Sequence, residues 1–204
     1  DGPTGRTLTF AQLAGASRLV AASLAARGFK KGDCFAIYCP NVPEYAIIFH
    51  AVAMLGGINT TANPLYTPHE LAFQLKDSNS KFLFTIPLFL PNAKQAAEMA
   101  GGIEEIFVFG EAEGATPFAA LLKSDGKVPE VSIDPQTDIV VLPYSSGTTG
   151  LPKGVMLTHA NLVSNIVQCG SMEFPGPLYM TEDDVVLGLL PFYHIYGMVV
   201  VMSW

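Results

Sequence analysis

The stretch Tyr144–Gly154, which reads YSSGTTGLPKG, combines four serine or threonine hydroxyls, three glycines and one lysine within eleven residues. Glycine permits backbone conformations in which successive N–H groups point toward a single anion. Hydroxyls and a lysine ammonium supply further donors to the same anion. This combination is typical of a loop that wraps a polyphosphate. A flexible connector is the alternative, because tracts rich in serine and glycine are often linkers.

Apolar residues on both sides of the loop favour phosphate binding over a linker. Residues Ile139–Leu142 precede the loop and Val155–Leu157 follow it, so we expect the loop to be held between two buried segments. The loop is not a Walker A motif, since that pattern requires Gly-Lys-Ser/Thr. Here Pro152 precedes Lys153, and Gly154 follows it.

Helical and strand patterns alternate along the rest of the chain, which predicts an α/β fold. Thr9 with Gln12, and Thr67 with Glu70, form capping boxes at two helix starts. The first helix repeats apolar residues at helical spacing, and these predict its core-facing side: Phe10, Leu13, Ala16, Val20 and Leu24. Four helices are predicted at 9–28, 41–57, 67–77 and 91–100, and four strands at 34–39, 81–86, 105–109 and 138–143. Residues 110–135 show no clear pattern and are predicted to form a surface excursion.

The composition limits the classes of partner and compartment. A net charge of -7, without a stripe of basic residues, argues against nucleic-acid binding. Cys34, Cys39 and Cys169 lie in apolar surroundings without the paired spacings of a zinc site, so we expect reduced, buried thiols in an intracellular protein.

Charged residues make up only 14% of the chain, against about 25% in an average domain. This scarcity predicts that much of the surface is covered, either by a large core or by protein outside this sequence. The sequence begins with Asp1 and stops at Trp204 inside an apolar run. These features predict an internal fragment of a longer protein.

The last twenty residues, Val185–Trp204, contain no Asp, Glu, Lys or Arg, and they approach the length of a membrane span. Pro191, His194 and Gly197 interrupt the centre of this run, however. A buried strand followed by a turn and a buried helix explains the pattern as well, and we expect no membrane span.

Three stretches together resemble one enzyme family. They are LPYSSGTTGLPKGVMLTHANLV at 142–163, GDCFAIYCPNVPEYAIIFHAVAMLGGINTTANPLYTPHEL at 32–71 and DDVVLGLLPFYHIYGM at 183–198. The first resembles the signature of the adenylate-forming, or AMP-binding, enzymes, and the others are similar to the branch of 4-coumarate–CoA ligases and beetle luciferases. The resemblance covers essentially all of residues 1–204. It implies the N-terminal part of the large, two-subdomain AMP-binding fold, in which helices flank the sheets.

The resemblance also implies roles for individual residues. The ATP phosphates would contact Ser145, Ser146, Gly147, Thr148, Thr149 and Lys153. His194, within PFYHIYG, would lie beside the reacting carboxylate and the α-phosphate as the catalytic residue. Tyr196 would line the acyl pocket. The resemblance assigns no metal ligand, although Mg²⁺ would share the charge of the phosphates.

The implied function is that of an acid–CoA ligase, which uses ATP to convert an aryl, hydroxycinnamic or fatty acid to acyl-AMP and then to acyl-CoA. One alternative is a luciferase-like or fatty-acyl adenylating enzyme. Another, of a different class, is a truncated, non-catalytic product that binds nucleotide or a partner. The implied partners are a small carboxylic acid, ATP and CoA, in the cytoplasm or the peroxisome. The family's Tyr-Gly-x-Thr-Glu motif and its catalytic lysine are not in this sequence, so the 204-residue chain alone is predicted to be inactive.

Overall fold

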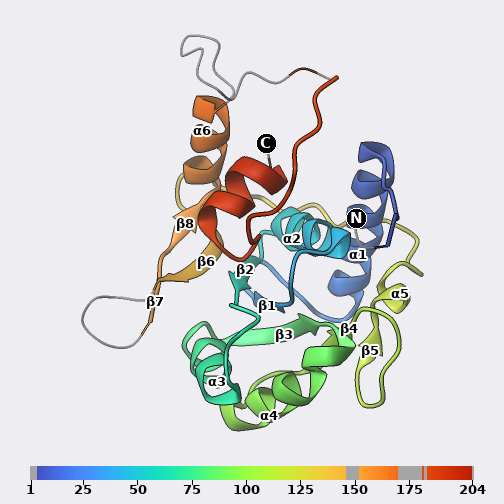
Figure 1. The fold of residues 1–204 in the computed structure, drawn as a ribbon, viewed down its shortest axis with the longest axis vertical. Coiled ribbons are helices and arrows are strands. Elements are labelled where there is room, and N and C mark those ends of the chain that lie inside the picture. The colour runs from blue at the N-terminus through green and yellow to red at the C-terminus, as the bar shows by residue number, and fades with distance from the viewer. Residues whose placement is uncertain (1–3, 146–151, 170–180, 182, 204) are drawn as a thin grey trace.

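A computed structural model of the protein describes residues 4–145, 152–169, 181 and 183–203. Helices and strands alternate along these residues, which confirms the predicted α/β class (Figure 1). The α-helices are α1 (Phe10–Ala26), α2 (Pro43–Met54), α3 (Pro68–Asp77), α4 (Leu90–Ala100), α5 (Phe118–Leu121) and α6 (His159–Cys169). The strands are β1 (Cys34–Tyr38), β2 (Ile58–Thr61), β3 (Ser80–Thr85), β4 (Glu105–Val108), β5 (Thr116–Pro117), β6 (Ile139–Ser145), β7 (Lys153–Gly154) and β8 (Leu157–Thr158). A 3-10 helix, η1 (Pro87–Phe89), and a π-helix, η2 (Gly197–Ser203), complete the described elements.

Among the described residues, the strands form one sheet in the order β5-β4-β3-β1-β2-β6-β7, and β8 also pairs with β6. The pairs from β5 through to β6 are parallel, whereas β7 and β8 run antiparallel to β6. The parallel strands therefore share one carboxyl edge. In open sheets of this kind, ligands bind outside the carboxyl ends of the strands, so this edge is where a site is expected.

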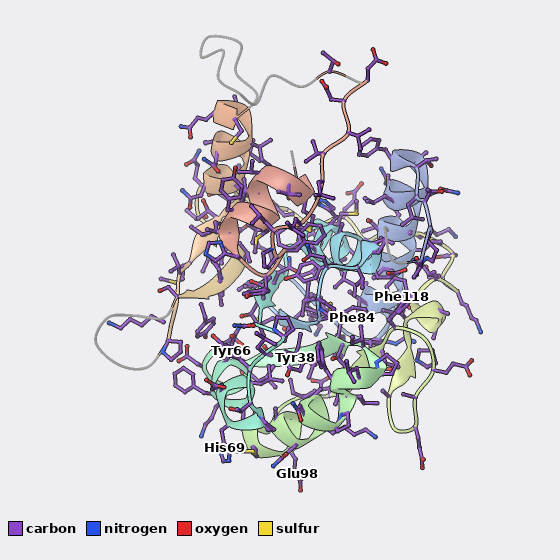
Figure 2. All side chains as sticks on the ribbon, in the orientation of Figure 1. Tyr38, Tyr66, His69, Phe84, Glu98 and Phe118 are labelled. Carbon is purple, nitrogen blue, oxygen red and sulfur yellow. The ribbon has the colours of Figure 1, made fainter. Side chains whose placement is uncertain are left out.

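Helices cover both faces of the sheet, with α1 and α2 on one side and α3 and α4 on the other (Figure 1). Successive side chains of β1 point to opposite faces: Ile37 packs with the α1–α2 cluster, and Tyr38 packs with the α3–α4 cluster. On the α1–α2 side the rings of Phe84 and Phe118 meet edge to face, with their centroids 5.9 Å apart (Figure 2). Since both faces of β1 are buried, its continuous apolar run CFAIY is what a central parallel strand requires.

Both predicted capping boxes are present. The Thr9 and Thr67 side chains accept hydrogen bonds from the backbone N–H groups of Gln12 and Glu70, whose own side chains bond back to the cap residues. One expectation for α1 is wrong. Phe10 does not face the core, because its side chain is 92% exposed at the first position of the helix.

The sequence analysis misses β2 because INTT lacks an apolar run. Asn59, Thr60 and Thr61 are nevertheless buried, and each donates a side-chain hydrogen bond to a backbone carbonyl. Asn59 donates to Phe49 at 3.1 Å and to Val140 at 3.3 Å, and Thr60 donates to Leu142 at 3.0 Å. These bonds offset much of the desolvation of the polar groups, so a polar strand is accommodated in the centre of the sheet.

The predicted surface excursion at 110–135 is correct for most of its length, but it contains β5 and the short helix α5. Phe118 and Leu121 of α5 are buried in the main core. A strand of two residues and a helix of four are too short to show a periodic pattern in the sequence.

The expectations for the cysteines are confirmed in part. All three are free thiols, and Cys34 and Cys39 are buried while Cys169 is half-buried. Burial raises the pKa of the Cys34 thiol to about 11, which keeps it protonated and unreactive at neutral pH.

The expectation of a buried strand at the start of Val185–Trp204 is wrong. No strand forms over 185–190, and the side chains of Val185, Leu187 and Leu189 are 97%, 81% and 75% exposed. No described strand pairs with this segment. The carbonyls of Gly188 and Leu190 accept from the Asn41 side chain instead, and that of Leu187 accepts from the N–H of Leu189. The helical part of the expectation is correct, since η2 follows and begins with buried residues. Among the described residues, no helix is both long and apolar enough to cross a membrane.

Candidate functional site

The two ends of the predicted phosphate loop lie side by side at the carboxyl edge of the sheet. Strand β6 delivers the chain to Ser145, and β7 takes it back from Lys153, with the two residues paired in register. The backbone N–H of Val155 donates to the carbonyl of Pro143 at 2.9 Å and extends this pairing. Ser146, Gly147, Thr148 and Thr149 fall outside the described residues. The structure therefore brings together the ends of the loop, with the Ser145 and Lys153 side chains both exposed.

The ammonium of Lys153 is available to an anionic ligand. It has no ion-pair partner among the residues that the structure describes, although other lysines such as Lys31 and Lys81 are paired with carboxylates. An unpaired ammonium on a flexible stem acts as a compact charge that can approach a phosphate oxygen.

The base of the loop is packed tightly. The Tyr144 hydroxyl donates to Oδ2 of Asp77, at the end of α3, at 2.5 Å. Across the strand pair, Tyr144 lies opposite Gly154, where a Cβ atom would come within 3.1–3.3 Å of the ring and hydroxyl of the tyrosine. Burial, together with the bond to Asp77, raises the pKa of the Tyr144 hydroxyl. This hydroxyl therefore remains a proton donor throughout the ordinary pH range.

A second segment is fixed over the same edge by Asn41, which follows β1. Its Nδ2 donates to the carbonyls of Leu190 at 2.8 Å and Gly188 at 3.3 Å, and its Oδ1 accepts from the N–H of Phe192 at 2.8 Å. The ring of Phe192 packs edge to face on Tyr45 of α2, with their centroids 5.7 Å apart. One asparagine thus orients the five residues that lead toward His194.

Strand β2 provides the next attachment. The Thr61 hydroxyl donates to the carbonyl of Tyr193 at 2.9 Å. Thr61 is also the register partner of Pro143 in β6. A single residue of β2 therefore touches both the strand that feeds the loop and the residue that precedes His194, so the two predicted halves of the site converge on the carboxyl end of β2.

His194 sits in a tight turn with an exposed side chain. Its backbone N–H donates to the carbonyl of Pro191 at 3.1 Å, and Gly197 lies so close that a Cβ atom there would be 2.1 Å from the same carbonyl oxygen. The Nδ1 atom of His194 accepts from the N–H of Tyr196 at 3.4 Å. Acceptance at Nδ1 favours the tautomer that carries its proton on Nε2, which leaves Nε2 free to donate to a ligand oxygen. Tyr196 is 47% exposed on the next turn.

Another pocket, of about 270 Å³, opens at the amino edge of the sheet between Asp33, Cys34, Ser78, Lys81 and Glu104. It lies at the starts of β1, β3 and β4, and Ser78 in its lining directly follows Asp77. In the part of the chain that the structure describes, no group of three or more His, Cys, Asp or Glu side chains could hold a metal ion.

The expectation of buried segments on both sides of the loop is only half correct. Val140 and Val141 of β6 are buried, but Val155 and Met156 are 44% and 69% exposed. These two residues join β7 to β8 along the outer edge of β6, where no further described strand covers them.

Sequence reasoning missed the residues that hold the site in place: Asn41, Thr61, Asp77 and Tyr144. Their hydrogen-bond partners lie 67 to 151 residues away along the chain, so no pattern of neighbouring residues predicts these four contacts. Asn41, Thr61 and Tyr144 do occur inside the stretches that carry the family resemblance, and this is the one available signal.

Comparison with known proteins gives consistent results. The family described as AMP-binding enzyme matches residues 2–204. A relative named 4-coumarate–CoA ligase 5, from Oryza sativa subsp. japonica, is 44% identical over 199 residues, or 97% of this chain. The match covers 36% of the rice protein, so the chain spans about a third of the length of the curated relatives it matches.

Two solved structures extend the likeness to the fold. A luciferase from Phrixothrix hirtus superposes with a TM-score of 0.90 over 99% of this chain and 40% of its own, at 23% identity. The anthranilate CoA ligase AuaEII, solved in complex with anthranoyl-AMP, superposes with a TM-score of 0.75 over 80% of this chain and 32% of its own, at 27% identity. The sheet and its flanking helices thus match the N-terminal domain fold of these enzymes.

Proposed function

The chain belongs to the AMP-binding enzyme family, and from this premise we propose that residues 1–204 form part of the N-terminal domain of an acid–CoA ligase. The observation that carries the proposal is the convergence at the end of β2. Thr61 is paired with Pro143 of the loop-bearing strand, and its hydroxyl also holds Tyr193 beside His194. A phosphate loop and a histidine at one edge of a sheet suit a reaction at a phosphorus atom.

The proposed reaction has two halves. An oxygen of the carboxylate attacks the α-phosphorus of ATP, the bond from that phosphorus to the bridging oxygen breaks, and pyrophosphate leaves. The sulfur of CoA then attacks the acyl carbon, the bond to the AMP oxygen breaks, and the thiol proton passes to solvent. The first half requires positioning and charge neutralisation more than a protein nucleophile.

The loop would neutralise the polyphosphate. Ser145 and Lys153 at its ends, with Ser146, Gly147, Thr148 and Thr149 between them, would contact the ATP phosphates. The exposed Lys153 ammonium, with no ion-pair partner among the described residues, suits this role. Mg²⁺ would arrive on the phosphates, as is usual for nucleotide-bound magnesium, and no residue is assigned as its ligand.

His194 would act at the reacting centre. With Nδ1 occupied by the N–H of Tyr196, the Nε2 proton can be donated to an oxygen of the carboxylate or the α-phosphate. Such a donor stabilises the charge that builds up during the attack. Tyr196, on the next turn, would line the space for the acyl group.

The named relatives suggest the substrate class. The rice relative is a 4-coumarate–CoA ligase, and AuaEII is an anthranilate CoA ligase, so an aryl or hydroxycinnamic acid is the first choice and a fatty acid the second. A protein that consumes ATP and CoA would work inside the cell, in the cytoplasm or the peroxisome.

The experiment uses the complete protein, translated from the whole reading frame that contains this sequence. Pyrophosphate release is measured with ATP, Mg²⁺ and a panel of acids that includes 4-coumarate, benzoate, anthranilate and a long-chain fatty acid. We expect release that depends on one class of acid, followed by thioester formation once CoA is added. The 204-residue chain by itself is expected to release none.

Two outcomes would redirect the proposal. Acyl-AMP formation without thioester formation would favour a luciferase-like adenylating enzyme. ATP binding without turnover of any acid would favour a non-catalytic nucleotide-binding protein and would contradict the ligase.

A further inference from the structure

The loop from Ser145 to Lys153 is held in place by the side chain of Tyr144, the residue that immediately precedes it. Tyr144 is the last residue of β6 before the loop, and its hydroxyl donates to Asp77 of α3 at 2.5 Å. A bond this short, to a carboxylate acceptor, belongs to the stronger class of hydrogen bonds. It ties the departing strand to a helix on the face of the sheet covered by α3 and α4.

The returning strand is fixed by the same ring. Gly154 pairs with Tyr144 across β6 and β7, and a Cβ atom at Gly154 would lie 3.1 and 3.2 Å from two ring carbons of Tyr144 and 3.3 Å from its hydroxyl oxygen, which is a tight contact. The ring is therefore in close contact with the backbone just after Lys153. Both ends of the loop rest on one tyrosine, and that tyrosine rests on Asp77.

Helix α3 is a firm support for this contact. Its first turn is closed by the Thr67–Glu70 capping box, and Gln74, one turn before Asp77, is buried and donates to the Thr60 hydroxyl of β2 at 2.8 Å. The carboxylate of Asp77 is thus held by a helix that is itself hydrogen-bonded to the neighbouring strand.

We propose that Tyr144 and Asp77 are positioning residues for ATP, because together they fix the separation and direction of the two ends of the phosphate loop. The inference rests on the proposed function for its consequence, which is the affinity for ATP. Neither residue touches the nucleotide in this scheme. They act through Ser145 and Lys153.

The first test is kinetic and uses the complete protein. Tyr144→Phe keeps the ring and removes the hydroxyl, and we expect the KM for ATP to rise roughly fivefold to tenfold. This is less than the full contribution of a hydrogen bond to a charged group, because the bond acts on ATP only through the ends of the loop. The KM for the carboxylic acid should stay within twofold. Asp77→Ala should match Tyr144→Phe, and Asp77→Asn, which retains an acceptor oxygen, should recover most of the affinity.

The double variant Tyr144→Phe/Asp77→Ala should be no worse than either single variant, because both remove the same bond. Thr116→Val is the matched control, since its hydroxyl donates to a carboxylate, Oε1 of Glu105, at 2.6 Å, and lies in β5 at the opposite end of the sheet from β7. It should leave the KM for ATP unchanged. Additive effects in the double variant, or a lower melting temperature with an unchanged KM for ATP, would overturn the proposal.

A second measurement does not depend on the enzyme's activity. Hydrogen exchange of the Val155 amide reports the pairing at the base of the loop, because that amide donates to Pro143. Tyr144→Phe should speed its exchange at least tenfold, and the control Thr116→Val should not. If the wild-type protein turns over no acid, the proposed function fails, whereas unchanged exchange at Val155 in Tyr144→Phe removes the positioning role itself.

Discussion

The Oδ1 atom of Asn41 accepts the backbone N–H of Phe192 at 2.8 Å, although the two residues are 151 positions apart in the chain. The Nδ2 atom of the same side chain donates to the carbonyls of Gly188 and Leu190. An amide has both donors and an acceptor, and here each side of the amide bonds the same segment. This segment leads to His194, so Asn41 determines where that histidine lies.

Replacement of Asn41 by alanine should therefore release the segment. We expect Asn41→Ala to lower the free energy of unfolding by about 1–3 kcal/mol, because three hydrogen bonds to backbone groups are lost. Limited proteolysis should cut within 185–192 faster than in the wild type, and kcat should fall. Asn165→Ala is the control, since Asn165 lies on exposed α6 and its amide makes only a local contact at 3.4 Å. Equal rates of proteolysis in the two variants would show that the Asn41 side chain does not hold this segment.

Replacement of Thr61 by valine tests the hydrogen bond between Thr61 and the carbonyl of Tyr193 with almost no change in side-chain shape. Thr61→Val keeps the shape and removes the hydroxyl that donates to Tyr193, which leaves a carbonyl without its partner. We expect a loss of about 1–2 kcal/mol in unfolding free energy and a lower kcat in the complete protein. Thr61→Ser restores the donor and should recover kcat more fully than stability. A serine variant as slow as the valine variant would mean that the hydroxyl has no role.

Replacement by alanine should have opposite effects on the free energy of unfolding at Gly197 and at Gly15. In Gly197→Ala the new Cβ would meet the carbonyl oxygen of Pro191 at 2.1 Å, so the turn that holds His194 must shift, at a cost of about 1–3 kcal/mol in unfolding free energy. Gly15 lies within α1 with nothing inside 4 Å of its Cβ position, and Gly15→Ala should stabilise the protein by about 0.5–1 kcal/mol. Thermal unfolding of both variants checks the signs.

Lys153 is the described cation of the proposed phosphate loop, and its removal should affect ATP selectively. We expect Lys153→Ala to lower kcat/KM for ATP about tenfold to a hundredfold, since a charge-assisted contact with phosphate contributes about 1.5–3 kcal/mol. Lys153→Arg should retain only part of the activity, because guanidinium and ammonium differ in shape. Lys123→Ala, at an exposed lysine outside the loop, should behave as the wild type. A loss of similar size in Lys123→Ala would show that the effect is one of general charge.

Stability should fall on mild acidification, because burial lowers the pKa of His50 from its ordinary value of 6.5. Below pH 6.5 the unfolded state takes up a proton that the folded state refuses, so stability is complete above 6.5 and declines as the pH drops toward the lowered pKa. Each histidine of this kind contributes a slope of at most about 1.4 kcal/mol for each pH unit. Urea unfolding between pH 5 and 8 measures it, and His50→Gln should flatten the curve in part. His159, whose pKa is also lowered by burial, contributes a slope of the same sign.

Local rules of the sequence predicted much of the architecture. The capping boxes at Thr9 and Thr67 identified two helix starts, because the bonds that define them lie within four residues. The apolar run at Cys34 identified the central strand. Strand β2 was missed, since its polar side chains are stabilised in the core by the carbonyls of Phe49, Val140 and Leu142. Phe10 was wrongly placed in the core, because a helical repeat does not say where the core ends.

The candidate site, like the fold, could be predicted from the sequence only in part. By itself the sequence predicted which groups form the candidate site, since the hydroxyls, glycines and lysine of Tyr144–Gly154 and the motif around His194 occur in contiguous stretches. Only the tertiary structure decided how these pieces meet. Asn41, Thr61, Asp77 and Tyr144 join segments that are far apart in the chain, and a hydrogen bond between distant residues leaves no periodic trace in sequence. The parallel sheet creates these contacts, because it brings the carboxyl ends of β1, β2 and β6 to one edge.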